Sequence, residues 1–188
     1  MRDLSLHLMD IIQNSIEAKA KRIYIEIAAD KDEDEMKILV EDNGIGMDKW
    51  MVEKVTDPFT TSRTSRKVGL GIPLFKASTE MTGGSFKIES EKGKGTRVIA
   101  TLKISHIDRL PLGDISETIV NVIAAYPEID IELKLNNTRS QNIFKLSEIK
   151  EHLRGIPVNE LKVLEWIREY INEAVKDIFG GVLSEIYS

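Results

Sequence analysis

The first stretch of the chain predicts an amphipathic helix, which limits what the remaining residues can form. Over residues 4–20, apolar residues recur at the three- and four-residue spacing of a helix face that points into a core. The opposite face is polar, and Asp10, Asn14 and Glu17 share it because they stand at positions i, i+4 and i+7. Their oxygens are ligands that suit a hard cation such as Mg²⁺. An ordinary solvent-exposed face is the alternative interpretation, and the helix alone does not decide between the two.

The residues after this helix predict a β-hairpin. Ile23, Ile25 and Ile27 alternate with polar residues, and residues 36–41 repeat that alternation after a charged loop. A helix followed by a hairpin favours an α+β sandwich, in which one side of the sheet is covered, over a parallel doubly wound fold. Later predicted elements are a short helix from Asp48 to about residue 55, a helix over 72–81, and a hairpin formed by 85–90 and 97–104.

Composition narrows the class of protein. The chain has 188 residues, a formal net charge of -5 and no cysteine. An acidic balance argues against a nucleic-acid surface, and the lack of cysteine excludes disulfides and thiolate metal sites. The apolar runs are too short for a membrane span, and no signal peptide is visible. We therefore expect a soluble cytoplasmic protein that binds neither nucleic acid nor membrane.

A glycine turn directly follows the second predicted strand. Asp42 ends that strand, and Gly44 and Gly46 come next with one residue between them. This spacing permits positive φ and lets the backbone approach a flat ligand closely. The carboxylate of Asp42 is a hydrogen-bond acceptor for an exocyclic amine such as the adenine N6 group. A tight turn around Asn43 without any ligand is the alternative.

A basic, hydroxyl-rich loop leads to a second glycine turn. Residues 57–67 supply several cations, among them Arg63 and Lys67, which are suited to contact an anion. Gly69 and Gly71 then open the next predicted helix. Backbone N–H groups at a glycine-rich helix N-terminus form a natural phosphate site.

These pieces occur in a fixed order, which is Asp10-x-x-x-Asn14, Asp42-x-Gly44-x-Gly46, Phe59-Thr60-Thr61, Gly69-x-Gly71 and Gly95-Thr96. The ordered set resembles the ATP-binding (GHKL, or Bergerat) fold shared by DNA gyrase, the Hsp90 chaperone, sensor histidine kinases and MutL. The resemblance covers about residues 4–104, and residues 57–74 are most similar to the catalytic domain of sensor kinases. It implies a two-layer α+β sandwich whose mixed, mainly antiparallel sheet has helices on one face.

The resemblance also implies roles for individual residues. Asn14 would coordinate the Mg²⁺ that bridges the phosphates, and Asp42 would bind the adenine N6 group, supported by Gly46 and Thr96 through a water. Asp10 stands where ATPase relatives carry a glutamate general base, so it is the candidate catalytic residue. The residues implied to bind ATP are Asn14, Glu17, Asp42, Gly44, Gly46, Met47, Phe59, Thr60, Thr61, Arg63, Lys67, Gly69, Leu70, Gly71, Ile72 and Thr96.

The sequence departs from the family pattern at several points. Asp10 is one methylene shorter than the usual glutamate, and Gly69 lacks the extra glycine that sensor kinases often carry two residues earlier. No histidine lies in the context of a phosphate acceptor, so we expect no autophosphorylation within this chain. His7 is expected at the helix surface or at the edge of the site.

The C-terminal part contains few glycines and predicts further helices and a strand. Asp114 is expected to cap a helix that ends near residue 125, and residues 129–135 alternate like a half-buried strand. Ser147 is expected to begin a short helix, and Asn159 to cap a long final helix that ends near residue 179. One apolar face of that final helix is expected in the core, with a dimer surface or a partner-docking face as alternatives.

We predict an ATP-binding domain over residues 1–106 and a helix–strand–helix extension of unknown role over 107–188. The extension is either a small second domain or a continuation of the first sheet.

Two functions fit these observations. The first is an Mg²⁺-dependent ATP-binding protein that hydrolyses ATP or transfers its γ-phosphoryl group to a separate protein. The second is a non-enzymatic, nucleotide-gated interaction module of a regulatory or anti-sigma-like kind. In either case we expect ATP and a protein substrate or regulatory partner, and a homodimer is an open alternative. Asp10 separates the two, because only the first needs a base.

Overall fold

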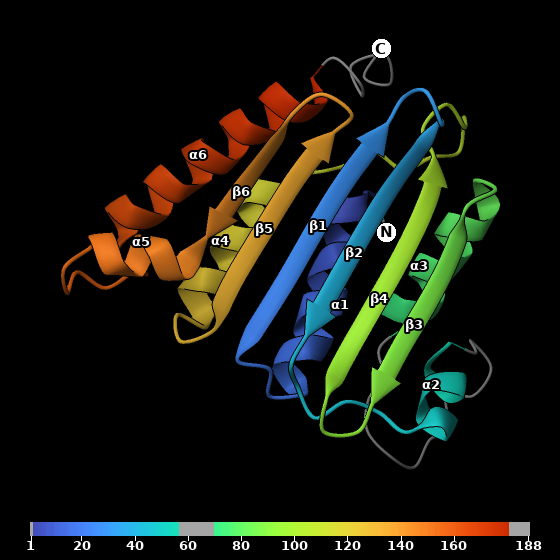
Figure 1. Ribbon diagram of the computed structural model, residues 1–188, viewed down its shortest axis with the longest axis horizontal. Coiled ribbons are helices and arrows are strands. Elements are labelled where there is room, and N and C mark those ends of the chain that lie inside the picture. Colours follow the sequence, from blue (N-terminus) through green and yellow to red (C-terminus); the bar gives the residue numbers. More distant parts are fainter. Residues whose placement is uncertain (1, 57–69, 181–188) are drawn as a thin grey trace.

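The computed structural model describes residues 2–56 and 70–180, which form a two-layer α+β sandwich. In this part of the chain the strands form one sheet in the order β3-β4-β2-β1-β5-β6. Every neighbouring pair is antiparallel except β1 and β5, which are parallel. Helices α1, α3 and α4 lie along one face of the sheet (Figure 1). The mixed, mainly antiparallel sandwich predicted from the sequence is therefore confirmed.

The strands are β1 (Arg22–Asp30), β2 (Glu35–Asp42), β3 (Ser85–Glu91), β4 (Gly95–Lys103), β5 (Asp130–Asn137) and β6 (Gln141–Lys145). The helices are α1 (Leu4–Glu17), α2 (Lys49–Val55), α3 (Gly71–Met81), α4 (Ile115–Ala125), α5 (Leu146–His152) and α6 (Leu161–Phe179).

Helix α1 forms because its ends are capped and one face is apolar. The side chain of Asp3 accepts a hydrogen bond from the backbone N–H of Leu6 at 3.0 Å, which satisfies one of the free donors at the helix start. Leu8 is fully buried against the sheet. The helix ends at Glu17, before the predicted residue 20, because Lys19 adopts a left-handed φ of 60°.

The alternation predicted for the first hairpin sorts its side chains between the two faces. Ile25 of β1 stands opposite Val40 of β2, and both are buried under the helices. On the other face Glu26 forms an ion pair with Lys134 of β5 at 3.2 Å. The period of two thus places apolar residues under the helices and charged residues on the other face.

The C-terminal part continues the first sheet rather than standing apart from it. Strand β5 pairs in parallel with β1, and Ile131 of β5 stands beside Ile23 of β1. The sequence left open whether this part forms a small second domain or continues the first sheet, and the structure shows that it continues the sheet. The placement of a domain boundary at residue 106 stays a prediction.

The long helix α6 completes this end of the molecule. Ile167, Ile171 and Ile178 are buried, so the predicted core face of this helix is confirmed. The prediction that Asn159 caps α6 was wrong, because the N-cap position belongs to Glu160 and carries no side-chain cap hydrogen bond. Strand β6 was not predicted.

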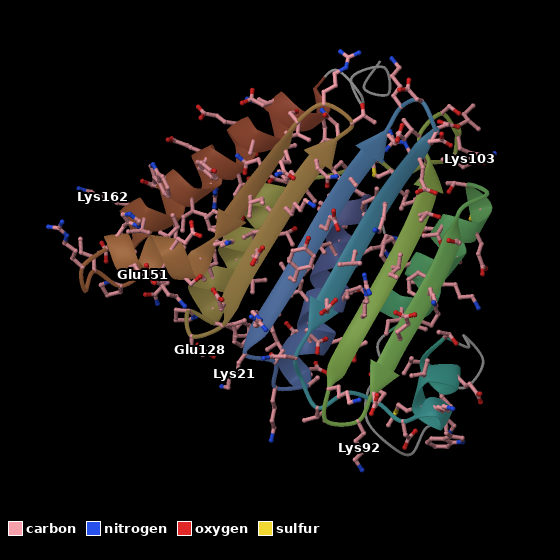
Figure 2. The ribbon with its side chains drawn as sticks, viewed as in Figure 1. Lys21, Lys92, Lys103, Glu128, Glu151 and Lys162 are labelled. Carbon is pink, nitrogen blue, oxygen red and sulfur yellow. The ribbon has the colours of Figure 1, made fainter. Side chains whose placement is uncertain are left out.

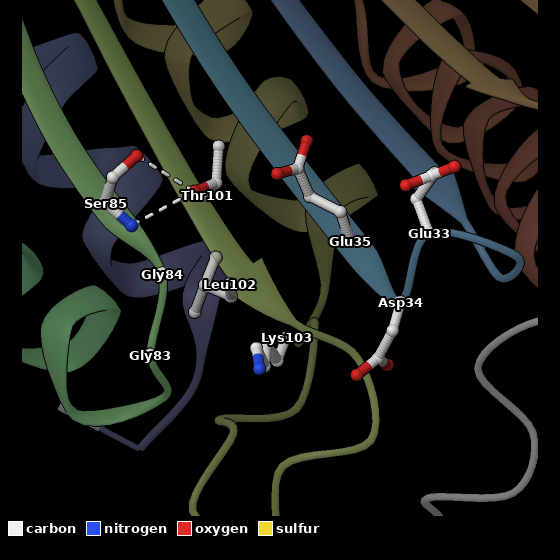
Figure 3. Close-up of a pocket in the computed structure, with 9 residues that line it drawn as sticks. All are labelled: Glu33, Asp34, Glu35, Gly83, Gly84, Ser85, Thr101, Leu102 and Lys103. Atoms are coloured by element: carbon white, nitrogen blue, oxygen red, sulfur yellow. Dashed lines mark hydrogen bonds between the residues drawn. The ribbon is translucent and has the colours of Figure 1, made fainter.

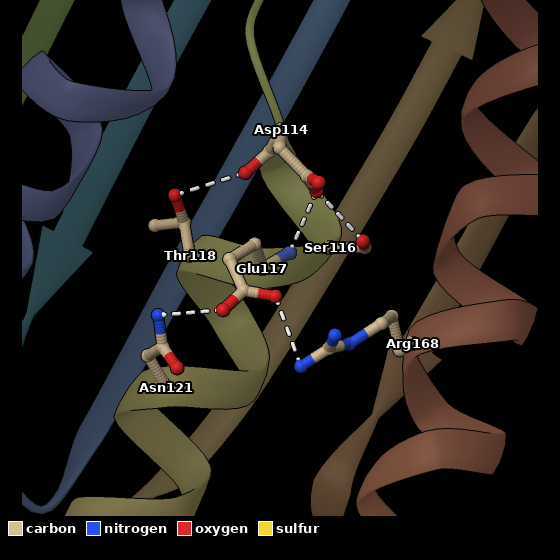
Figure 4. A network of polar contacts seen from close by, with 6 residues as sticks. All are labelled: Asp114, Ser116, Glu117, Thr118, Asn121 and Arg168. Atoms are coloured by element: carbon tan, nitrogen blue, oxygen red, sulfur yellow. Dashed lines mark hydrogen bonds and ion pairs between the residues drawn. The ribbon is translucent and has the colours of Figure 1, made fainter.

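Helices α4 and α6 are joined by a polar network (Figure 4). Asp114 caps α4 as predicted, since its side chain accepts from the N–H of Glu117 at 2.8 Å. Glu117 then pairs with Arg168 of α6 at 2.9 Å, and it accepts from the amide of Asn121.

None of the described helices combines the length and apolar character needed to cross a membrane.

Candidate nucleotide-binding site

The candidate site lies at the end of the sheet where β2 finishes. Figure 2 shows Lys21 and Lys92 at this end and Lys103 at the opposite end. The backbone N–H of Lys21 donates to the side chain of Asn43, which also accepts from the N–H of Arg22. Asn43 thus ties the residues after β2 to the start of β1, so Asn43-Gly44 is a connection held in place and not the turn of a hairpin.

Asp42 is the best-defined residue of the site. It is 8% exposed, and its two carboxylate oxygens are held from different sides. Oδ1 accepts from the backbone N–H of Gly44 at 2.8 Å, and Oδ2 accepts from the hydroxyl of Ser15 on α1 at 2.7 Å. The structure therefore places an oriented, acceptor-only group where the sequence predicts the adenine contact.

The two glycines after Asp42 are required for different reasons. Gly46 has a φ of 63°, in the left-handed region that glycine tolerates best. Gly44 lies against the last turn of α1, where an added Cβ would stand 2.7 Å from the carbonyl oxygen of Ala18. Gly44 is thus restricted by space alone, whereas Gly46 combines positive φ with an added Cβ that would overlap the carbonyl of Glu91.

The turn between β3 and β4 closes the other side of this region. The N–H of Gly93 donates to the carbonyl of Ile45 at 2.7 Å, and the N–H of Met47 donates to the hydroxyl of Ser90 at 2.8 Å. Ser90 in turn contacts the hydroxyl of Thr96 at 2.9 Å. Thr96 stands opposite Asp42 in the register between β2 and β4. The structure therefore brings Thr96 beside Asp42.

The polar face of α1 turns partly toward α3. Asp10 and Asn14 are half-buried, whereas Glu17 is exposed. Asp10 lies against Gly71, where an added Cβ would stand 2.5 Å from its Oδ2. Burial raises the pKa of the Asp10 carboxyl, because desolvation disfavours the charged form.

Helix α3 begins beside Asp10. Gly71 is its first residue, and Leu70 occupies the N-cap position without a side-chain cap hydrogen bond. Leu70 is exposed and Ile72 is buried in the core. The first N–H groups of an α-helix have no partner within the helix, so the start of α3 offers donors to an anion. The remaining residues that the resemblance implies for ATP binding, Phe59, Thr60, Thr61, Arg63, Lys67 and Gly69, lie outside the described residues.

His7 does not lie where the sequence placed it. It is 1% exposed, and its ring stacks on Phe75 of α3 at a centroid distance of 4.9 Å. Its Nε2 lies 3.3 Å from the hydroxyl of Ser78. The expectation of a surface or site-edge residue was wrong, because the helix face that carries His7 is covered by α3. Burial lowers its pKa to about 4.

Two contributors to the site were missed from the sequence. Ser15 and Ser90 hold Asp42 and Met47 through side-chain hydrogen bonds. Ser15 falls on the core side of the predicted helix. A polar residue among apolar ones needs a hydrogen-bond partner, and this was the feature of the sequence that could have identified it.

A separate pocket lies at the far end of the sheet (Figure 3). It has a volume of about 200 Å³, and none of the predicted site residues lines it. Its walls come from the β1–β2 loop and the segments at the end of α3 and of β4. They are formed by Glu33, Asp34, Glu35, Gly83, Gly84, Ser85, Thr101, Leu102 and Lys103.

Comparisons with known proteins identify the family. The model of the family described as "Histidine kinase-, DNA gyrase B-, and HSP90-like ATPase" matches residues 2–106. This match covers more than half of the chain, so the protein belongs to the histidine kinase-, DNA gyrase B- and HSP90-like ATPase family. The resemblance inferred from the ordered motifs is confirmed.

Curated relatives include sensor proteins of bacteria. Sensor protein DegM of Bacillus sp. (strain B21-2) is 31% identical over 97 residues, which cover 52% of this chain and 26% of that protein. Sporulation kinase D of Bacillus subtilis (strain 168) is 33% identical over 98 residues, which cover 52% of this chain and 19% of that protein. The chain thus matches about a quarter or less of the length of these relatives.

A solved structure shares the fold. "Crystal Structure of N terminal domain of a DNA repair protein" superposes with a TM-score of 0.52 and 16% sequence identity. The superposition covers 76% of this chain and 52% of that chain. At this level of identity the likeness shows the architecture alone.

Proposed function

We propose that this protein binds ATP with Mg²⁺ in the cytoplasm and either hydrolyses it or transfers its γ-phosphoryl group to a separate protein. The observation that carries the proposal is the Asp42 carboxylate, buried and held by Ser15 and the Gly44 N–H. Such an acceptor suits the 6-amino group of adenine. Membership of the ATPase family supports the binding of ATP.

The phosphates are proposed to extend from Asp42 toward the start of α3. Gly71 and its neighbours would bind them through backbone N–H groups, and Asn14 would hold Mg²⁺ through its amide oxygen. Among the described residues no group of three His, Cys, Asp or Glu side chains is arranged to hold a metal. Mg²⁺ is commonly bound by few protein oxygens together with substrate phosphates and waters, which suits Asn14 as the proposed protein ligand. When bound, Mg²⁺ would neutralise charge on the phosphates.

Asp10 is proposed to orient or deprotonate the attacking group. Its raised pKa supports this role, because a general base works best when its pKa lies closer to the working pH. Its contact with Gly71 sets it beside the proposed phosphate site.

A nucleotide-gated interaction module is the second candidate. It is favoured by the short side chain of Asp10, which is an aspartate where ATPase relatives carry glutamate. In such a module ATP would change the preference for a partner without turnover.

Calorimetry with ATP, in the presence and absence of Mg²⁺, tests the binding proposal. Asp42→Asn should weaken ATP binding by at least about tenfold, since it replaces an acceptor oxygen by a donor. Asp32→Asn is the matched control, because Asp32 is an exposed carboxylate in the loop at the other end of the sheet. Unchanged affinity in Asp42→Asn would remove the proposed adenine contact.

Labelled ATP separates the activities. The protein is incubated with γ-labelled ATP and cell extract, and the label is traced to free phosphate, to a protein or to neither. Asp10→Asn should abolish turnover if Asp10 is a base. Binding without turnover in the wild type would favour the module.

A further inference from the structure

Ser15 is a buried hydroxyl that makes none of the contacts to ATP proposed above. It is 2% exposed, and its Oγ lies 2.7 Å from Oδ2 of Asp42 and 3.3 Å from the carbonyl oxygen of Ile11. A serine hydroxyl carries one proton. The hydroxyl donates this proton to Asp42 and not to Ile11, because the contact to Asp42 is shorter and hydrogen bonds to charged acceptors are stronger.

The second oxygen of Asp42 is held independently. The N–H of Gly44 donates to Oδ1 at 2.8 Å, so each oxygen accepts from one donor among the described residues. A carboxylate has about four acceptor sites in all, and part of this capacity stays free for a ligand. The direction of the free lone pairs is fixed by the two donors.

The backbone of Asp42 is held by a different element. Asp42 stands opposite Thr96 of β4, and an added Cβ on the neighbouring Gly95 would overlap the Asp42 carbonyl. Strand β4 therefore fixes the main chain, and the rotation of the carboxylate about its side-chain torsions is left to Ser15 and Gly44.

We propose that Ser15 is a positioning residue that makes the site selective for a 6-aminopurine nucleotide. It acts through Asp42, and the proposal rests on the function proposed above. A carboxylate attracts the 6-amino group of adenine and repels a 6-oxo group, but only while its free lone pairs point at the base. The Ser15 hydroxyl holds them in that direction.

The test measures dissociation constants for three nucleotides in wild type and Ser15→Ala. The nucleotides are ATP, inosine triphosphate with a 6-oxo group, and purine riboside triphosphate with hydrogen at that position. Ser15→Ala should weaken the binding of ATP by about tenfold, which is equivalent to the loss of one hydrogen bond to a charged group. The dissociation constant of purine riboside triphosphate should change by less than about twofold, because this nucleotide offers Asp42 no amine.

Ser5→Ala is the matched control. Ser5 lies on the same helix, is 5% exposed and donates to Asp3 at 2.6 Å, away from Asp42. It should leave the preference for ATP over inosine triphosphate unchanged. Ser15→Thr keeps the hydroxyl and should retain that preference, and circular dichroism confirms that each variant is folded.

A double-mutant cycle tests whether Ser15 acts through Asp42. In an Asp42→Asn background, Ser15→Ala should cause no further loss of ATP affinity. Equal losses for all three nucleotides, or full additivity with Asp42→Asn, would overturn the proposal. If the wild type binds no ATP, the proposed function itself fails. If the wild type prefers ATP and Ser15→Ala keeps that preference, only the role of Ser15 fails.

Discussion

Asp10 of α1 and Gly71 of α3 lie in direct contact, so the position of Gly71 has no room for a side chain. A Cβ there would stand 2.5 Å from Oδ2 of Asp10 and 2.7 Å from its Cβ. The contact joins the helix proposed to hold Mg²⁺ to the helix start proposed to hold the phosphates. The spacing of the two helices is therefore set beside the proposed phosphate site.

Gly71→Ala should lower the free energy of unfolding by about 1–3 kcal/mol and weaken ATP binding. Alanine is the better helix former, but the overlap with Asp10 forces α1 and α3 apart, and overpacking of this kind costs about that much. Denaturant unfolding and calorimetry with ATP measure the two effects. Ala77→Leu adds a larger side chain on the exposed side of α3 and should change stability by less than about 0.5 kcal/mol. A Gly71→Ala variant that is more stable than wild type and binds ATP normally would contradict the contact.

Gly46 and Gly93 form a natural pair for a second prediction. Both have positive φ, 63° and 83°, so alanine at either position costs about 1–2 kcal/mol of backbone strain. Only Gly46 also lacks space, because its added Cβ would overlap the carbonyl of Glu91, whereas a Cβ added to Gly93 would meet no atom of the described residues within 4 Å. Gly46→Ala should therefore destabilise the protein more than Gly93→Ala does. It should also weaken ATP binding, which Gly93→Ala should leave intact. Equal thermal shifts in the two variants would show that the Gly46 turn relaxes freely.

The burial of His7 predicts a loss of stability in mild acid. Its pKa falls from 6.5 to about 4 because burial disfavours the charged ring. Between these values the unfolded chain binds a proton and the folded chain does not, so stability is full above pH 6.5 and is lost as the pH falls toward 4. The loss from this residue is about 3 kcal/mol at most.

His7→Phe separates this effect from the titration of carboxyl groups. Phenylalanine can keep the stacking on Phe75 but cannot take up a proton. Urea unfolding followed from about pH 8 to about pH 4 should show a shallower decline for His7→Phe than for wild type. Parallel declines in the two proteins would mean that His7 is protonated without cost in the fold.

The sequence predicted those parts of the fold that depend on local periodicity. The alternation of Ile23, Ile25 and Ile27 identified β1, since a half-buried strand needs that pattern. Strand β6 was missed because it has only five residues and lies at the sheet edge, where Ile143 is exposed and the pattern is weak. The error at Asn159 arose because a capping residue type is common in loops as well as at helix starts.

The parts of the candidate site that could be predicted are those where the local sequence allows few backbone conformations. Asp42 and Gly46 could be placed because a strand end followed by glycines restricts the backbone. The burial of His7 and the bond from Ser15 to Asp42 depend on how α1 packs against α3 and β2. Those contacts join residues far apart in the chain, and helical periodicity gives only the face on which a residue lies.

The last prediction concerns the boundary at residue 106. Strand β5 pairs with β1 from Arg22 to Ala29, and the N–H of Leu4 donates to the carbonyl of Pro111 at 2.9 Å. A fragment of residues 1–106 would leave that edge of β1 unpaired, which favours aggregation. It would also expose apolar surface of α1 and the sheet, because the buried core runs without interruption into α4 and β5.

We expect the fragment of residues 1–106 to be insoluble or to melt well below the full chain in a thermal scan. Arg168→Ala, which removes only the exposed ion pair with Glu117, should cost less than about 1 kcal/mol. A fragment that is monomeric, unfolds cooperatively and binds ATP like the full chain would instead establish residue 106 as a true domain boundary.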